Sequence, residues 1–437
     1  SLQRGFEELV CIGALNGVER YWYQVETAKR AIRQFKGRVL LCDEVGLGKS
    51  VEAGMVVKEY LLRGMAKSVL VLAPAPLVSQ WKEELSEKFG LEFSTTEDAA
   101  FQADAASFWK RDLVIASIHT AKRERHLPAV TARTFDVVVV DEAHHLKNRG
   151  SLAWKLVNEV KKRFLLLLTA TPVQNNLVEL FNLITLLKPG QFKTERLFRD
   201  EYMERGDQRT PKNKEKLREL LRDVMIRNTR SAIDLKLPKR FATTLRLEPG
   251  QAERDIYDGV SALVRGPSAS LPQHTAHLLM REAGSSPFAL GKTLKGLEPR
   301  HGFDAGPILR AIESLGGLSK GEALLELVAR NPDERKLVFV QYLSSMDYIT
   351  GLLSEHGVPF GVYRGDMTAR DKDAAIARFR EGVPVLVSTE SGGEGRNLQF
   401  CNTIVNFDLP WNPMRIEQRI GRLHRIGQKR DVFIFNL

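Results

Sequence analysis

The sequence holds few of the features that mark secreted, fibrous or membrane-spanning proteins. Its 437 residues include three cysteines, Cys11, Cys42 and Cys401, and this odd, scattered set predicts reduced thiols in an intracellular protein. Apolar runs such as 137–140 and 164–168 fall far short of the roughly 20 residues that cross a bilayer. No apolar stretch follows Ser1 to provide a secretory leader. We therefore expect no membrane partner.

The composition is that of a folded globular chain, with 43% hydrophobic and 27% charged residues. Lys and Arg number 65 against 54 Asp and Glu, a net charge of +11. A basic excess favours a polyanionic partner because each neutralised phosphate releases counterions, although a merely soluble basic protein would fit equally. The chain lacks a starting Met and stops inside an apolar run, which predicts a fragment of a longer protein.

Short apolar runs alternate with amphipathic segments in both halves of the chain, a pattern typical of parallel sheets covered by helices on both faces. The expected strands are 38–42, 68–73, 112–117, 135–140, 164–168, 336–341, 358–363, 384–388, 403–407 and 432–435. The fold class is therefore α/β, with two doubly wound parallel-sheet lobes. The first lobe should span 1–230, with a helical protrusion at about 176–230. A linker and second helical insertion should span 231–320, and a second, truncated lobe should span 321–437.

The strongest local signal is the stretch from Asp43 to Ser50, which contains Gly46, Gly48 and Lys49 between a predicted strand and a predicted helix. Glycines here let backbone N–H groups surround phosphate oxygens at a helix N-terminus. Lys49 would reach the β- and γ-phosphates, and Ser50 would hold Mg²⁺. The strict pattern has Gly at position 43, where this chain has Asp. An ordinary Gly-rich turn is the alternative.

A carboxylate pair, Asp141 and Glu142, follows the β-branched run 137–140. In parallel sheets ligands bind at the carboxyl ends of strands. Asp141 can support Mg²⁺ through its water shell, and Glu142 can orient and deprotonate an attacking water. The alternative is a helix start with acidic residues that suit the helix dipole.

Further motifs appear in order along the chain: Glu142-Ala143-His144, the stretch 167–172, the stretch 388–398, and 418–428 with its Gln-Arg-Ile-Gly-Arg core. Together they resemble the SWI/SNF-type DNA translocases of helicase superfamily two, from about Tyr23 to Gln428. Details at 43–49 and 393–397 resemble the prokaryotic branch, which includes the bacterial RNA-polymerase-associated ATPase. The resemblance implies two RecA-like lobes.

The resemblance also implies an ATP site. Gln24 would read adenine, and the phosphate loop would contribute Asp43, Gly46, Leu47, Gly48, Lys49 and Ser50, with Gly395 from the later motif. Gln418 would position water or the γ-phosphate. Arg422 and Arg425 would act as arginine fingers from the second lobe, neutralising charge on the transferred phosphoryl group. A solvated helix face is the alternative for these arginines.

Contacts to DNA phosphates are implied for residues on loops after strands: Pro74, Ser117, Gln341, Arg364, Ser388 and Thr389. Such contacts would position the chain on DNA without reading its sequence, and an exposed loop without a ligand is the alternative. Trp81, Trp154 and Trp411 tempt a base-stacking role, but packing is the better interpretation for them. His144 and His145 are adjacent on an expected helix, so we expect no metal pair.

The leading hypothesis is an ATP-driven translocase on double-stranded DNA that uses ATP and Mg²⁺ in the nucleoid of a prokaryotic cell. Closure of the cleft between the lobes would couple hydrolysis to stepping. A strand-separating helicase on DNA or RNA is the alternative, and a nucleic-acid-binding scaffold with a decayed ATPase is a third. RNA polymerase or another DNA-bound complex would be the partner protein.

Overall fold

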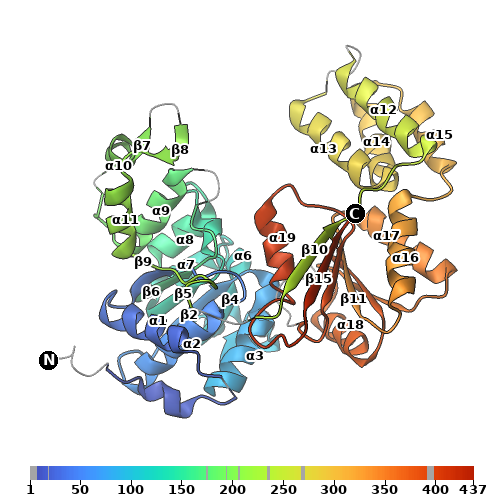
Figure 1. Ribbon diagram of the computed structural model, residues 1–437. Coiled ribbons are helices and arrows are strands. Elements are labelled where there is room, and N and C mark those ends of the chain that lie inside the picture. The colour runs from blue at the N-terminus through green and yellow to red at the C-terminus, as the bar shows by residue number, and fades with distance from the viewer. Residues whose placement is uncertain are drawn as a thin grey trace. The chain divides into compact units, whose positions relative to one another are not determined.

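The computed structural model describes residues 7–17, 19–173, 176–192, 194–204, 207–233, 237–266, 271–390 and 398–437. The chain forms two compact units, residues 1–236 and 237–437 (Figure 1). Each unit contains its own parallel sheet and its own apolar core. No helix within the described ranges is long and apolar enough to cross a membrane.

The first unit is built on a parallel sheet with strand order β3-β4-β2-β5-β6-β1-β9. Its strands are β1 (Arg38–Leu41), β2 (Val69–Ala73), β3 (Ser94–Thr95), β4 (Leu113–Ser117), β5 (Thr134–Val140), β6 (Lys161–Leu168) and β9 (Met225–Ile226). The central strands are buried along most of their length because their Val and Leu residues pack on both faces of the sheet. Odd and even positions of one strand, such as Val139 and Val138, therefore belong to different apolar clusters.

Helices cover both faces of this sheet. They are η2 (Val10–Ala14), α1 (Trp22–Arg33), α2 (Lys49–Leu62), η3 (Ala75–Leu77), α3 (Val78–Phe89), α4 (Ala99–Ala103), α5 (Ala105–Phe108), α6 (Ile118–Ala121), α7 (Leu127–Ala132), η4 (Ala143–Leu146), α8 (Leu152–Glu159), α9 (Leu177–Leu187), α10 (Glu195–Tyr202) and α11 (Lys214–Arg222). Helices α1, α2 and α3 pack into the cluster on one face, and α8 and α9 pack into the cluster on the other.

The protrusion expected at 176–230 is not wholly helical. Besides α9, α10 and α11 it contains an antiparallel pair, β7 (Met203–Glu204) and β8 (Asp207–Pro211), and the short strand β9. None of these strands has an apolar run that could have predicted it. Strand β9 pairs parallel with β1 and so returns this segment to the edge of the main sheet.

The second unit has a parallel sheet with strand order β10-β15-β14-β11-β13-β12. Its strands are β10 (Arg240–Thr244), β11 (Lys336–Val340), β12 (Phe360–Tyr363), β13 (Val385–Thr389), β14 (Thr403–Asn406) and β15 (Val432–Asn436). The helices beside the sheet are α16 (Ser319–Arg330), α17 (Leu343–Glu355), α18 (Ala369–Glu381) and α19 (Pro413–Ile420).

A helical insertion also belongs to the second unit. It consists of α12 (Gln251–Arg265), α13 (Gln273–Ser285), α14 (Pro287–His301) and α15 (Gly306–Glu313). These helices share a separate apolar cluster that includes Ile256, Leu279 and Leu290. The insertion therefore has a small core of its own, and it joins the sheet of the second unit through α14 and α17.

Candidate functional site

The loop between β1 and α2 has the conformation that phosphate binding requires. Gly46 and Gly48 have φ angles of +89° and +85°, a left-handed region that side chains disfavour. A Cβ atom on Gly48 would also lie 2.5 Å from Nε2 of Gln24. Gly48 precedes the first residue of α2, Lys49, so the loop presents the N-terminus of a 14-residue helix. Such an end attracts anions through its unpaired N–H groups and its dipole.

The Lys49 ammonium lies over the same loop. Its Nζ donates to the carbonyl oxygens of Asp43 at 2.7 Å and Glu44 at 3.4 Å. Ser50 is the second residue of α2, so its hydroxyl lies at the same helix end. The loop thus brings one cation and one hydroxyl to the place where a phosphate would bind.

Asp141 directly follows the buried end of β5, is partly exposed and is held by two donors. Its Oδ2 accepts from the Trp81 indole Nε1 at 2.9 Å, and its Oδ1 accepts from the backbone N–H of Glu142 at 2.8 Å. Burial and the neighbouring charge of Glu142 raise the pKa of Asp141 to about 6. The two hydrogen bonds and the charge of Lys49 act in the opposite direction.

Glu142 has a strained backbone. Its φ and ψ angles of 47° and 49° lie in the left-handed region, which is uncommon for a residue with a long side chain. Strain of this kind gathers at functional sites, where the surrounding structure enforces it. His144 Nδ1 lies 3.0 Å from Oε2 of Glu142, so the strained turn brings an imidazole to this carboxylate.

The donor set fits Mg²⁺. The Ser50 hydroxyl and the Asp141 carboxylate are oxygen ligands, which this ion prefers. In the described part of the chain, no group of three or more His, Cys, Asp and Glu side chains could hold a metal by itself. Mg²⁺ characteristically keeps several waters and binds through one or two protein oxygens together with substrate phosphates. Ser50 and Asp141 would hold the ion in that way, and the ion would neutralise phosphate charge.

Gln24, expected to read adenine, is only 2% exposed. Its Nε2 donates to the carbonyl oxygen of Leu47 at 2.8 Å, and the Tyr23 hydroxyl donates to the same oxygen at 2.7 Å. Helix α1 is therefore bonded directly to the phosphate loop. The sequence shows Tyr23 as part of an aromatic stretch beside Gln24, but its hydrogen bond to the phosphate loop was not predicted.

In the second unit, Gln418 lies in α19, and Arg422 and Arg425 follow that helix. All three side chains are partly exposed. Between them, Arg419 is buried and donates through Nη1 to Oδ1 of Asn406 and the carbonyl oxygen of Asp408. These bonds fix α19 to the end of β14. Gly395, the remaining residue of the expected ATP set, lies outside the described residues.

The residues expected to contact DNA all lie at the carboxyl ends of parallel strands. In the first unit, Pro74 follows β2 and Ser117 ends β4; in the second, Gln341 follows β11, Arg364 follows β12, and Ser388 and Thr389 end β13. Pro74, Gln341 and Arg364 are partly exposed, whereas Ser117, Ser388 and Thr389 are buried. The Ser388 hydroxyl donates to the carbonyl oxygen of Thr389 at 2.9 Å.

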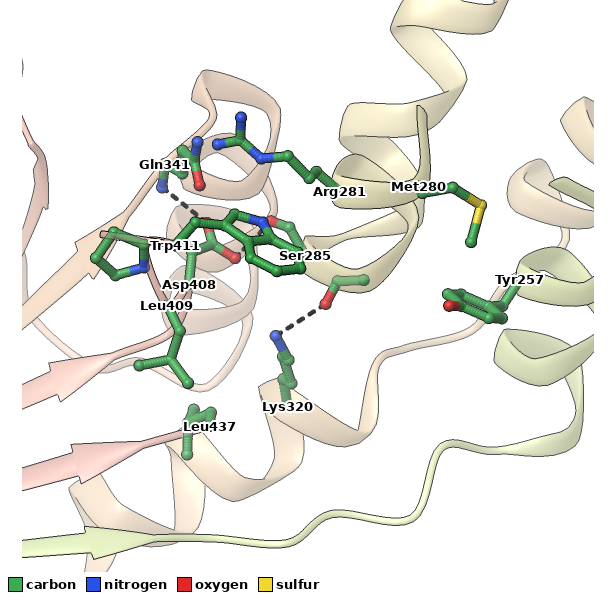
Figure 2. A pocket seen from close by; sticks show the side chains of 12 residues that line it. Tyr257, Met280, Arg281, Ser285, Lys320, Gln341, Asp408, Leu409, Trp411 and Leu437 are labelled. Atoms are coloured by element: carbon green, nitrogen blue, oxygen red, sulfur yellow. Dashed lines mark hydrogen bonds between the residues drawn. The ribbon is translucent and has the colours of Figure 1, made fainter. Parts of the chain in front are cut away.

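A pocket of about 520 Å³ lies where the helical insertion meets the carboxyl ends of β11 and β14 (Figure 2). Asp408 is buried beneath it and accepts from the Gln341 backbone N–H at 2.7 Å and from the Ser285 hydroxyl. Lys320 Nζ donates to the carbonyl oxygens of Gly284 and Phe407, both at 3.2 Å. Asp408 and Lys320 thus connect α13 to the strand ends.

Trp411, at the rim of this pocket, corrects one sequence interpretation (Figure 2). We expected Trp81, Trp154 and Trp411 to pack. The first two are 3% and 6% exposed, but Trp411 is 81% exposed. Trp411 lies in the loop before α19, where Asn412 caps the helix by accepting from the Met414 N–H. The prolines on either side keep this stretch out of a helix, so the indole has no amphipathic face to join.

Two family models match successive parts of the chain. Residues 23–294 match the SNF2-related domain, and residues 319–427 match the helicase conserved C-terminal domain. The chain is 38% identical over 423 residues to an "Uncharacterized ATP-dependent helicase YqhH" from Bacillus subtilis, covering 95% of this chain and 74% of that protein. It is 31% identical over 459 residues to "RNA polymerase-associated protein RapA" from Vibrio cholerae, covering 94% of this chain and 47% of that protein.

A solved structure, "Sulfolobus solfataricus SWI2/SNF2 ATPase core in complex with dsDNA", matches with a TM-score of 0.48 and 21% identity, covering 96% of this chain and 88% of that one. The chain spans about half the length of the RapA proteins. The SNF2-related match covers more than half of the chain, and the Bacillus relative is matched over most of its length. The chain therefore belongs to the SNF2 family, the SWI/SNF-type ATPases of helicase superfamily two, with two RecA-like lobes.

Proposed function

We propose that this chain is an ATP-dependent translocase on double-stranded DNA, which moves along the duplex and displaces bound protein. Membership of the SNF2 family implies ATP hydrolysis. The observation that carries the proposal is that the phosphate loop with Lys49 follows β1 while Asp141 and Glu142 follow β5, so all three residues come after the carboxyl ends of strands in one parallel sheet. A phosphate-binding lysine and two partly exposed carboxylates at the same edge of a parallel sheet are the groups that Mg²⁺-assisted phosphoryl transfer requires.

The contacts within the first unit support the following roles. The loop from Asp43 to Ser50 surrounds the phosphates, and Lys49 leaves its carbonyl partners to neutralise them. Asp141 would help to hold Mg²⁺ through its water ligands, and the bound ion would neutralise charge on the transferred phosphoryl group. Glu142 accepts a proton from the attacking water. Gln24 senses the nucleotide through its bond to Leu47.

The second unit would supply Gln418, Arg422 and Arg425 to the same reaction. The buried bonds of Arg419 hold α19 rigidly, which favours a fixed position for the residues around it. An arginine finger is worth roughly 10³- to 10⁵-fold in rate. We expect Arg422→Ala or Arg425→Ala to remove most ATP turnover, whereas Arg370→Ala on exposed α18 should leave turnover within about twofold.

DNA would be bound through its phosphates at the carboxyl ends of the strands. Pro74, Gln341 and Arg364 are accessible for such contacts, whereas Ser117, Ser388 and Thr389 would act through backbone groups because their side chains are buried. Such contacts carry no sequence information and suit a protein that moves along DNA. The net charge of +11 supports a polyanionic partner such as DNA.

ATP turnover measured with no nucleic acid, duplex DNA, single-stranded DNA and RNA at one fixed salt concentration tests the proposal. We expect duplex DNA to stimulate turnover most. Stronger stimulation by single strands or RNA would instead favour the strand-separating helicase. Equal turnover in all four conditions would contradict coupling to nucleic acid.

Glu142→Gln separates catalysis from binding in the same assay. The variant should lose on the order of 10²- to 10⁴-fold in turnover while it still binds MgADP, because only the proton acceptor is removed. Glu87→Gln, an exposed residue of α3, is the matched control. Unchanged turnover in Glu142→Gln would rule out Glu142 as the base.

We also propose that the displaced or recruiting protein is a DNA-bound complex. The RapA relatives are named as RNA polymerase-associated, which makes RNA polymerase the first candidate. This chain covers about half of those proteins, so retention of RNA polymerase should be measured with the 437-residue chain itself. The nucleoid of a prokaryotic cell would be its location.

A further inference from the structure

The phosphate loop has a neighbour that comes from far along the chain. Strand β9 runs parallel to β1, with Leu40 opposite Met225 and Leu41 opposite Ile226. The Cys42 N–H donates to the carbonyl oxygen of Ile226 at 2.8 Å. Continued by two residues, this register brings Asp43 beside Asn228. The stretch that follows β9 therefore runs along the stretch that follows β1.

Asn228 holds Asp43 at two points. The Asn228 backbone N–H donates to Oδ1 of Asp43, and Asn228 Nδ2 donates to Oδ2, each at 2.8 Å. Asp43 is fully buried, so these bonds are made away from water, where they are strongest. Asn228 Nδ2 also lies 2.9 Å from Oγ1 of Thr27 in α1, one turn beyond Gln24. One side chain thus joins the loop to the helix that carries Gln24.

Arg230 holds the next two residues of the loop. Its backbone N–H donates to Oε2 of Glu44 at 3.2 Å, and its Nη2 donates to the carbonyl oxygen of Val45 at 2.6 Å. The Arg230 Nε and Glu44 Oε2 atoms are 3.9 Å apart, which adds an ion pair. Glu44 in turn donates through its N–H to the carbonyl oxygen of Asn228 at 3.2 Å. Residues 43–45 are therefore bonded continuously to residues 228–230.

We infer that Asn228 and Arg230 are positioning residues that tie the phosphate loop to the connection between the two units. The second unit begins at residue 237, a few residues after Arg230. A nucleotide that fixes residues 43–45 also fixes the start of this connection. If nucleotide binding shifts the equilibrium between two arrangements of the connection by some factor, then by linkage fixing the favoured arrangement raises nucleotide affinity by up to the same factor. The inference rests on the proposed ATP site and deepens it.

The pairing also explains the residue at position 43. The strict phosphate-loop pattern has Gly there, and Gly could not accept the two hydrogen bonds from Asn228. The Asp43 side chain points toward β9, and its carbonyl oxygen accepts from Lys49. The backbone carbonyl of Asp43 thus accepts a hydrogen bond from the phosphate-binding lysine, and its side chain accepts hydrogen bonds from Asn228 at the start of the connection.

A charge exchange tests the pairing in the full 437-residue chain. Asn228→Asp puts a second carboxylate against Asp43, and the dissociation constant of MgADP should rise about tenfold or more, the scale of a hydrogen bond to a charged group. The double variant Asp43→Asn with Asn228→Asp restores one donor and one acceptor, and should return to within about threefold of wild type. Arg230→Ala should weaken MgADP several-fold, whereas Arg227→Ala, an exposed arginine of the same segment, should not.

Hydrogen exchange gives a readout that a purely structural role would not change. MgADP should slow exchange of the Asn228 and Arg230 amides in the wild-type chain, because both donate to loop side chains. This protection should be smaller in Arg230→Ala, which lacks the guanidinium bond to Val45 and the ion pair with Glu44, at temperatures where thermal unfolding shows the variant to be folded. Folded Arg230→Ala therefore keeps the test valid even if Asn228→Asp does not fold.

The outcomes separate the two proposals. A wild-type chain that binds no MgADP overturns the proposed function and this inference with it. A wild-type chain that binds MgADP without change at residues 228–230, with equal affinity in Asn228→Asp and Arg230→Ala, overturns the inference alone. Failure of the double variant to recover what Asn228→Asp loses overturns the pairing of residues 43 and 228.

Discussion

The indole N–H of Trp81 donates to a carboxylate oxygen of Asp141 at 2.9 Å. Trp81 is 3% exposed on α3 and Asp141 follows the last residue of β5, so a packed core residue of one helix also orients a residue of the candidate site. The hydrogen bond favours the charged form of Asp141 and so opposes the rise of its pKa by burial. A tryptophan that looked purely structural thus has an electrostatic role.

Trp81→Phe should reduce ATP turnover on the order of tenfold near neutral pH, because one hydrogen bond to the Asp141 carboxylate is lost. Since this bond lowers the pKa of Asp141, its loss should move the acid limb of the pH–rate profile to higher pH. Trp154→Phe is the control, because it removes an indole N–H that donates to the Asn182 carbonyl oxygen, away from the site. Equal profiles for both variants would contradict the assignment.

Gly48→Ala should weaken nucleotide binding through two effects. A left-handed backbone costs a non-glycine residue about 1–2 kcal/mol, and the new Cβ would lie 2.5 Å from Nε2 of Gln24. Gly190→Ala isolates the first effect, because Gly190 has a φ of +87° and open space around it. MgADP titration of both variants should show reduced affinity in Gly48→Ala alone. The same loss in both would mean that the contact with Gln24 is unimportant.

Asp408→Ala should destabilise the second unit by about 2–3 kcal/mol, because the Gln341 N–H and the Ser285 hydroxyl lose a charged acceptor. Asp347→Ala removes an exposed carboxylate of α17 and should change stability by less than about 0.5 kcal/mol. Urea unfolding monitored by hydrogen exchange can assign the loss of stability to the second unit. A midpoint shared by the two variants would contradict the role of Asp408 in holding α13 to the sheet.

Glu59→Gln should show a pH-dependent loss of stability. Burial tends to raise the pKa of Glu59, but donors from Cys11, Arg63 and Val10 outweigh it and hold the pKa below its ordinary value of 4.5. A lowered pKa means that the carboxylate stabilises the fold above pH 4.5 and that this contribution is lost as pH falls below it. The difference from wild type, about 1.5–3 kcal/mol at pH 7, should therefore shrink in acid.

Urea unfolding at pH 7 and pH 4 measures this difference. Glu87→Gln again serves as the control, because its exposed carboxylate should give little difference at either pH. The opposite result is a stability difference between wild type and Glu59→Gln that is the same at both pH values. That result would mean that the buried donors do not favour the charged form of Glu59.

The sequence predicts most of the sheet structure, because strands buried on both faces must be apolar throughout. Every expected strand is confirmed, with ends that differ by one to three residues. Strands β9 and β10 could not be predicted in this way. Strand β9 has only Met225 and Ile226, and β10 is exposed along its length, so each forms only because a partner strand supplies hydrogen bonds.

The candidate site was predicted as a set of residue types but not as a network. Spacing identified Lys49, Asp141 and Glu142, because phosphate and Mg²⁺ need those groups after strands. Three features depend on tertiary contacts between distant segments: the backbone strain at Glu142, the hydrogen bond from Trp81 to Asp141, and the hydrogen bonds from Asn228 to Asp43. Polar residues directly after a strand, as in 227–230, were the one local signal for the last of these.

The position of β9 also has a consequence for biosynthesis. Strand β1 lies between β6 and β9, and β9 leaves the ribosome about 185 residues after β1. Until then one side of β1 has unpaired backbone groups, and the hydrogen bonds between Asp43 and Asn228 have not formed. A nascent first unit would therefore expose a sheet edge directly beside its nucleotide loop, where aggregation begins most readily. Chaperone dependence should be greatest for chains stalled between residues 170 and 224.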